Sequence, residues 1–223
     1  DSHAEGFTTE ASSIASHSEG YKTIASGYAS HAEGGQMNED HSDTLSNRTI
    51  SATDHPIIGT VDVAISSTTA QGVQSHAEGT QTFAFGYSSH AEGYKTNALG
   101  NESHTEGIST YAIGSASHAE GQNSLASGNY SHAEGNGTIA EGISSHAEGG
   151  GEGGSGRPKA SGDYSHAEGY GEILASGKAS HAEGTQTTAS GEASHAEGCY
   201  TRATGIGAHA EGGTPGPGSG LTT

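Results

Sequence analysis

The sequence predicts an all-β fold, a parallel β-roll or β-solenoid built from 14-residue coils of two short strands each. A pentapeptide, SHAEG or a near variant, occurs thirteen times, and consecutive copies lie 14 residues apart in nine of the twelve gaps. Each period contains two alternating stretches, S-H-A-E-G and T-x-A-x-G, joined by two-residue links. One side of each stretch carries only small residues. A strict period of this kind is typical of stacked solenoid coils.

Composition taken alone would predict a disordered chain. Leu, Ile, Val and Phe make up 23 of 223 residues, and the formal net charge is -19. Both values are typical of disorder, but a disordered chain has no physical reason to keep small residues in register. The seven Lys and Arg residues argue against nucleic-acid binding. No apolar run approaches the ~20 residues of a membrane span, so we expect no membrane insertion. Because residue 1 lies inside a repeat, we expect a fragment or a processed product.

The alternation assigns residues to faces, because successive side chains of a strand point to opposite sides. Ser, Ala and Gly of the first stretch are expected inside, as are Thr, Ala and Gly of the second, which leaves a thin interior. The outward positions of the first stretch carry His and Glu in every copy, whereas those of the second vary, as at Ile24, Phe83 and Tyr111. The uniform face predicts a uniform neighbour, and the variable face predicts solvent or a partner.

So thin an interior buries little apolar area to offset the entropy of ordering the chain, so we expect oligomerisation. A homotrimer with the His/Glu faces toward the threefold axis would give every coil the same neighbours; a single-chain solenoid is the alternative. The proposed axis network comprises His3, Glu5, His17, Glu19, His31, Glu33, His76, Glu78, His90, Glu92, His104, Glu106, His118, Glu120, His132, Glu134, His146, Glu148, His166, Glu168, His181, Glu183, His195, Glu197, His209 and Glu211.

The alternation S-H-A-E-G followed by T-x-A-x-G resembles the S-V-A-I-G and A-x-G pattern of the YadA-like head repeat. This 14-residue unit, also called the Hep/Hag repeat, occurs in trimeric autotransporter adhesins, and similar repeats occur in phage tail fibres. The resemblance covers all thirteen copies, with His and Glu at the family's apolar Val and Ile positions. It implies a trimer of left-handed parallel β-rolls, an extracellular location on a virion tail fibre or a bacterial cell surface, and adhesion rather than catalysis.

Rows of glutamates on coils stacked about 4.8 Å apart would repel by roughly 3.5 kcal/mol per neighbouring pair at an effective dielectric near 20. We expect a structural His-Glu hydrogen-bond network to relieve this repulsion. Two alternatives remain open. The first is a metal ion such as Zn, Ni or Fe at a few histidines; otherwise we expect no cofactor. The second is a pH-responsive module, whose sign depends on whether glutamate proximity or burial dominates the histidine pKa.

Insertions divide the chain. The expected segments are β-roll repeats at 1–34, an inserted loop or hairpin at 35–67, repeats at 68–148, a Gly-rich loop at 149–159, repeats at 160–212 and a Pro/Gly-rich tail at 213–223. The stretch PIIGTVDVAI within the first insertion has the β-branched alternation of a strand or hairpin. The extra residue near Gly171 predicts a small bulge.

The expected function is a non-enzymatic trimeric fibre segment for host or surface attachment, and a purely structural spacer or filament subunit is a further alternative. No H-E-x-x-H or G-x-S-x-G motif is present, so we expect no enzyme. The partners would be further copies of the chain and a cell-surface receptor. A glycan is one candidate ligand, because aromatic residues could form a stacking surface; they are Phe7, Tyr21, Phe83, Phe85, Tyr94, Tyr111, Tyr170 and Tyr200.

Overall fold

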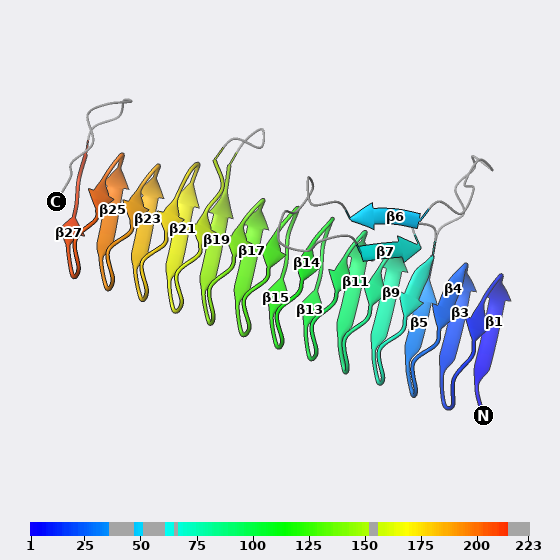
Figure 1. Cartoon of the computed structure of the whole chain (residues 1–223). Coiled ribbons are helices and arrows are strands. Elements are labelled where there is room, and N and C mark those ends of the chain that lie inside the picture. The colour runs from blue at the N-terminus through cyan, green and yellow to red at the C-terminus, as the bar shows by residue number, and fades with distance from the viewer. Residues whose placement is uncertain (36–46, 51–60, 65–66, 152–155, 214–223) are drawn as a thin grey trace. The chain divides into compact units, whose positions relative to one another are not determined.

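The computed structural model describes residues 1–35, 47–50, 61–64, 67–151 and 156–213. The chain divides into two compact units, Asp1–Ile113 and Gly114–Thr223. Both are all-β, and within each the coils stack as a parallel β-solenoid (Figure 1). No helix among the described residues is long and apolar enough to cross a bilayer.

The first unit has two parallel sheets, one from each stretch of the repeat. The first sheet contains β1 (His3–Phe7), β3 (His17–Tyr21), β5 (His31–Gly34), β9 (His76–Thr80), β11 (His90–Tyr94) and β13 (His104–Thr105). The second contains β2 (Glu10–Ala11), β4 (Thr23–Ala25), β8 (Thr68–Ala70), β10 (Phe83–Ala84), β12 (Asn97–Ala98) and β14 (Tyr111–Ala112). Each coil therefore contributes one strand to each sheet.

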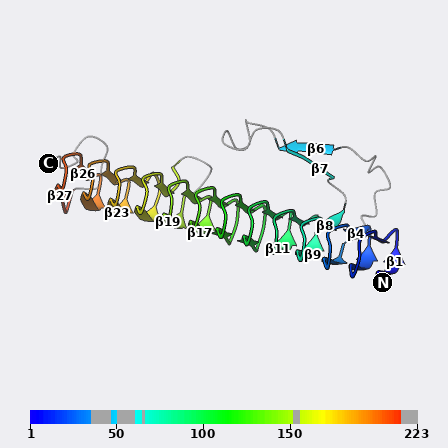
Figure 2. The same cartoon turned by 60° about the horizontal axis from the view of Figure 1, so that its bottom comes forward.

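The second unit repeats the arrangement. Its first sheet contains β15 (His118–Ala119), β17 (His132–Asn136), β19 (His146–Gly150), β21 (His166–Tyr170), β23 (His181–Thr185), β25 (His195–Cys199) and β27 (His209–Ala210). Its second sheet contains β16 (Leu125–Ala126), β18 (Ile139–Ala140), β20 (Lys159–Ala160), β22 (Leu174–Ala175), β24 (Thr188–Ala189) and β26 (Arg202–Ala203). In the turned view each coil is a flattened loop with its two strands on opposite sides (Figure 2).

The register places identical repeat positions over one another. His76 pairs with His90 in the first unit, and His132 pairs with His146 in the second. Backbone amides donate to the following coil, as from His76 N to the Ser89 carbonyl oxygen at 2.9 Å. The predicted all-β parallel solenoid is confirmed, because the 14-residue period and the hydrogen-bond ladder coincide.

The core is a stack of small side chains, as predicted for Ser, Ala and Thr. Ala25, Ala84 and Ala98 of the second sheet have no exposed surface, and neither do Ala77 and Ala91 of the first. In a coil this thin the facing alanines fill the space between the sheets, so a larger residue on both faces would force the sheets apart.

The first glycine of the repeat does not lie inside, which corrects the sequence prediction. Gly93 is exposed and has a φ of 106°, and Gly20 at the same position has a φ of 115°. A Cβ on Gly93 would overlap the backbone of Gly107 in the next coil. The position therefore needs glycine for its backbone conformation and its close stacking, rather than for a small core volume. The second glycine, such as Gly86, is buried as predicted.

Each two-residue link contains a left-handed residue. Examples are Gln186 in the first link, with a φ of 56°, and Ala116 in the second, with a φ of 52°. This conformation costs a non-glycine residue roughly 1–2 kcal/mol, and the chain itself uses glycine at equivalent positions, at Gly137, Gly171 and Gly207. The strain is therefore built into the repeat and offset by coil stacking.

The serine of the repeat closes the second link. Ser89 Oγ donates to the carbonyl oxygen of Gly86 at 2.8 Å. Equivalent bonds from Ser30, Ser131 and Ser194 measure 2.7 Å. The serine at this repeat position therefore closes the turn through a hydrogen bond, in addition to filling space in the core.

All three departures from the 14-residue period fall in the first link. One lies between β5 and β8, the second between β19 and β20, and the third, a single residue, between β21 and β22. Within the first insertion, β6 (Asn47–Ile50) pairs antiparallel with β7 (Val61–Ala64), and β7 lies in the predicted PIIGTVDVAI stretch. The rest of that insertion, part of the Gly-rich loop and most of the predicted tail lie outside the described residues.

The variable face is less exposed than the alternation predicts. Phe83 and Tyr111 are only 7% and 3% exposed, so they cannot belong to a surface for stacking ligands. Phe85 of this face is 53% exposed, and Phe7 and Tyr170, which end strands β1 and β21 of the first sheet, are 65% and 54% exposed. Outward direction in a strand therefore does not guarantee contact with solvent.

Candidate functional site: the His/Glu ladder

The most regular surface of each unit is the row of His and Glu side chains on its first sheet, which we call the His/Glu ladder. In the first unit it comprises His3, His17, His31, His76, His90 and His104 with the glutamate two residues after each. In the second unit it comprises His118, His132, His146, His166, His181, His195 and His209 with their glutamates. The structure brings these predicted residues together within each unit, because the parallel register stacks every copy on the last.

The imidazole rings stack face to face along each unit. In the first unit His31 and His76 have centroids 4.8 Å apart and planes 2° apart, although 45 residues separate them in sequence. In the second unit His146 and His166 are 4.7 Å and 3° apart. The exception is the pair His3 and His17, at 5.2 Å and 63°. The spacing follows the distance between neighbouring strands.

Many of the histidines lie beside the glutamate of their own coil. The His76 Nε2 and Glu78 Oε2 atoms are 3.7 Å apart, and the His181 Nε2 and Glu183 Oε2 atoms are also 3.7 Å apart. Both side chains of the His181 pair are about one-third exposed, at 35% and 31%. Exposed pairs of this kind contribute about 0–1 kcal/mol each.

The expected His-Glu hydrogen bond occurs at His166, whose Nε2 lies 3.3 Å from Glu148 Oε1 of the preceding coil. Seven other histidines differ. Their Nε2 atoms have almost no accessible surface and make no hydrogen bond; they are His31, His76, His90, His132, His146, His181 and His195. A buried nitrogen without a hydrogen bond is costly, so the expected His-Glu network forms only in part within one chain.

Burial settles the direction of the histidine titration. It lowers the pKa of His90 and of His146, and the neighbouring histidines lower each pKa further. The pKa values of His31 and His181 are lowered for the same reasons. The glutamates act in the opposite direction but do not prevail. The lowered pKa values favour the neutral form of these four imidazoles, so they do not compensate the charges of the neighbouring carboxylates.

The glutamates instead hold protons between themselves. Hydrogen bonding to the Glu78 and Glu106 carboxyl groups raises the pKa of Glu92 to about 7. In the second unit, hydrogen bonding to Glu148 and Glu183 raises the pKa of Glu168 to about 7, and the bond to Glu168 lowers that of Glu148 to about 2. Neighbouring carboxyl groups at these coils thus share protons, and this sharing relieves the like-charge repulsion that the sequence predicts.

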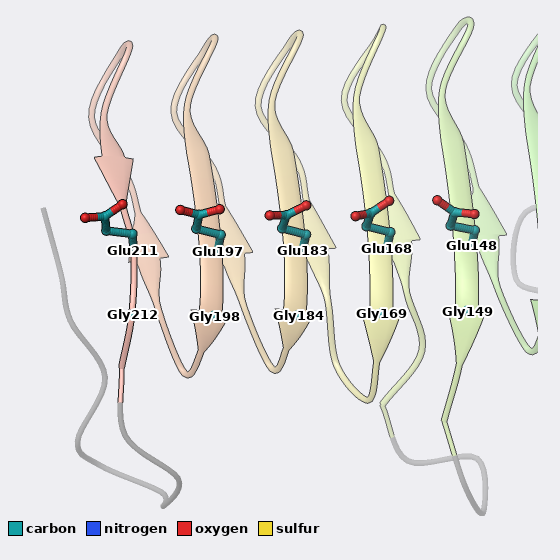
Figure 3. Close-up of a pocket in the computed structure, with 10 residues that line it drawn as sticks. All are labelled: Glu148, Gly149, Glu168, Gly169, Glu183, Gly184, Glu197, Gly198, Glu211 and Gly212. Carbon is teal, nitrogen blue, oxygen red and sulfur yellow. The ribbon is translucent and has the colours of Figure 1, made fainter.

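A groove runs beside the glutamates of the second unit. It has a volume of about 780 Å³ and is lined by Glu148, Gly149, Glu168, Gly169, Glu183, Gly184, Glu197, Gly198, Glu211 and Gly212. Figure 3 shows the carboxylates in a row, each with the glycine of its coil below it. Sequence reasoning missed this groove because it placed the first glycine inside. The glycine's position directly before a two-residue link was the available signal.

Comparison with known families agrees with this geometry. The YadA head domain repeat family matches residues 66–89, 106–131 and 119–145, under a third of the chain. The repeat is a YadA-like head repeat. No curated protein matches the chain. The matched family is an adhesin-type structural repeat.

Several groups of residues in the His/Glu ladder bring metal-ligating atoms close together. Groups such as His76, Glu78 and His90, or His166, Glu168 and His181, have their nitrogen and oxygen atoms within 4.8 Å of one another. Neutral imidazole and carboxylate are suitable ligands for zinc, nickel or iron. The fit of each group depends on distances that differ from coil to coil.

Proposed function

We propose that the chain is a non-enzymatic segment of a trimeric attachment fibre, in which the His/Glu ladders of three chains meet along a threefold axis. The YadA-like head repeat supports an adhesin-like role and a surface-exposed, extracellular location. The finer assignment is to a virion tail fibre or a bacterial surface adhesin that binds a host receptor.

One observation carries the trimer. Partly exposed His and Glu side chains, such as those of His76 and Glu78 or His181 and Glu183, repeat at intervals of 4.7–4.9 Å on one face of each unit. A second and a third copy in the same register would present their own carboxyl groups to every coil at once, because symmetry repeats each contact. A smaller or irregular partner would match only a few coils.

Light scattering tests the trimer directly. We expect a mass near three times the 22.1 kDa of one chain. His181→Asp should weaken the assembly, because it adds a negative charge to a ladder already rich in carboxylates. Thr188→Asp is the matched control. It adds the same charge on strand β24 of the second sheet, outside the ladder. A folded 22.1 kDa monomer would contradict the trimer.

Attachment needs a separate measurement. We expect the purified trimer to bind host cells and to compete with the intact fibre for them. The receptor-binding residues would be sought among the insertions and the exposed aromatic residues Phe7, Phe85 and Tyr170, with glycans as the first ligands to screen. If binding persists after the whole repeat region is deleted from the fibre, the region is a structural spacer.

A further inference from the structure

We propose that His166, Glu148 and Glu168 form a binding site for a divalent transition-metal ion, with Zn²⁺ as its best-fitting occupant. The site goes beyond attachment and is complete within one chain, so it does not depend on the trimer. All three residues lie on the first sheet of the second unit, on β19 and β21.

The two nitrogen–oxygen distances at this coil are both short. His166 Nε2 lies 3.3 Å from Glu148 Oε1 and 3.5 Å from Glu168 Oε2. Ligand atoms about 2.0–2.2 Å from a tetrahedral zinc ion are separated by roughly 3.3–3.5 Å from one another. The nitrogen therefore already lies at the separation from each of the two oxygens that one ion would impose. A fourth position is left for water, as in other three-ligand zinc sites.

Other coils fit less well. His132 Nε2 lies 3.4 Å from Glu120 Oε1 but 3.8 Å from Glu134 Oε2. His195 Nε2 is 4.0 Å from Glu183 Oε1. The same coordination there would require larger side-chain movements, so we expect weaker binding at those coils.

Two stacked histidines would have to rotate toward each other to share one ion. The rings of His146 and His166 are parallel and 4.7 Å apart, and those of His166 and His181 are 4.8 Å apart. Two nitrogens bound to one zinc ion can be at most about 4.2 Å apart, even on opposite sides of it. The ligand set is therefore one histidine with the carboxylates of its own and the preceding coil.

The donor set also predicts which ion is selected. One imidazole with two carboxylates suits Zn²⁺, Ni²⁺ or Fe²⁺. Ca²⁺ requires six to eight oxygen ligands at longer distances, which three residues cannot provide. Selection of Zn²⁺ over Ca²⁺ thus separates a built site from general attraction of cations to an acidic surface.

Equilibrium dialysis of the full-length chain against Zn²⁺ alone tests the proposal. We expect one tightest site per chain, unaffected by an equal concentration of Ca²⁺. His166→Gln should abolish that tightest class, and Glu168→Gln should weaken it by about tenfold or more. Glu192→Gln is the control, because Glu192 is an exposed residue outside the ladder and should bind Zn²⁺ like the unaltered chain.

Circular dichroism establishes that each variant is folded, and Glu148→Gln replaces any variant that is not. Equal Zn²⁺ binding by the unaltered chain and His166→Gln would overturn the proposal, as would displacement of Zn²⁺ by an equal concentration of Ca²⁺. Light scattering on the same samples reports the trimer separately, so a monomer that keeps the tight site would contradict the assembly and leave the metal site standing.

Discussion

Replacing Thr96 and Thr110 by valine, one at a time, tests what the buried hydroxyl groups do in the core. The two residues precede strands β12 and β14 in consecutive coils, and both are completely buried. The Thr110 hydroxyl donates to the carbonyl oxygen of Glu106 at 3.1 Å. The Thr96 hydroxyl makes no hydrogen bond. The same substitution should therefore have opposite effects at neighbouring positions.

The magnitudes follow from the hydrogen-bond difference. An unsatisfied buried hydroxyl costs about 1–3 kcal/mol, so Thr96→Val should stabilise the fold by about 1 kcal/mol. Thr110→Val removes a made bond and should destabilise it by about 1 kcal/mol. Ile173 supports the first expectation, because it occupies the equivalent position in the second unit with no exposed surface.

Thermal unfolding followed by far-ultraviolet circular dichroism measures both variants. A difference of about 2 kcal/mol corresponds to midpoints about 4–8 °C apart for a chain of this size. Amide hydrogen exchange in β12 and β14 would localise the changes. If Thr96→Val lowers the midpoint as much as Thr110→Val does, the Thr96 hydroxyl has a partner and the reasoning is wrong.

Three further changes test other parts of the repeat. Gly86→Ala should lower the free energy of unfolding by several kcal/mol in a denaturant titration, because its Cβ would overlap the Gly100 carbonyl oxygen of the next coil. A Cβ at Gly207 meets no atom within 4 Å, so the control Gly207→Ala should cost only about 1 kcal/mol, for its φ of 63°. Gln186→Gly should raise the thermal midpoint, since relief of about 1–2 kcal/mol of left-handed strain exceeds the entropy cost of about 0.5–1 kcal/mol, whereas Gln186→Ala should not. Glu92→Gln resembles the protonated carboxyl group. The raised pKa of Glu92, about 7, means that its stabilising protonated form is lost as pH rises from 4.5 through 7. Relative to the unaltered chain, the variant should therefore gain about 1 kcal/mol of stability at pH 8.5, after allowance for solvent screening, and nothing near pH 4.5. Thermal midpoints at the two pH values measure the difference. Equal midpoint shifts at both pH values, or the same behaviour in the exposed control Glu102→Gln, would contradict this expectation.

The histidines predict a separate pH dependence. Because burial lowers the pKa of His90 and His181, their contribution to stability is present at high pH and is lost as pH falls through the unfolded value of about 6.5. The raised glutamates oppose this loss between pH 7 and 4.5. Below pH 4.5 the lowered carboxylates, such as Glu148, also become protonated, so we expect the steepest fall in stability there.

The period and the side-chain alternation predicted most of the fold. They placed Ser, Ala and Thr in the core because strand geometry fixes side-chain direction. They misplaced the first glycine because alternation stops where the chain turns, as at Gly93 with its φ of 106°. The alternation placed Phe83 on the outward face and did not predict that it is buried. Burial depends on neighbouring residues that a local pattern does not include.

The candidate ladder was predicted residue by residue, but its chemistry was not. Sequence spacing brings each histidine close to a glutamate, and the expected relief of charge was a hydrogen bond between them. That bond depends on tenths of an ångström, and the structure gives it at His166. Proton sharing along the glutamate row depends on the stacking of carboxyl groups from different coils, which no single repeat contains.

The two links of each coil have different capacities for change. The second link is closed by its serine hydrogen bond, such as that from Ser89 to Gly86, and all three departures from the period lie in the first. New segments can therefore enter at one corner of the solenoid while both sheets keep their register. The first link is thus a place where the sequence can diversify, whereas the two sheets must stay constant. Recombination between copies of the repeat would lengthen the sheets without changing the segments inserted at the first link.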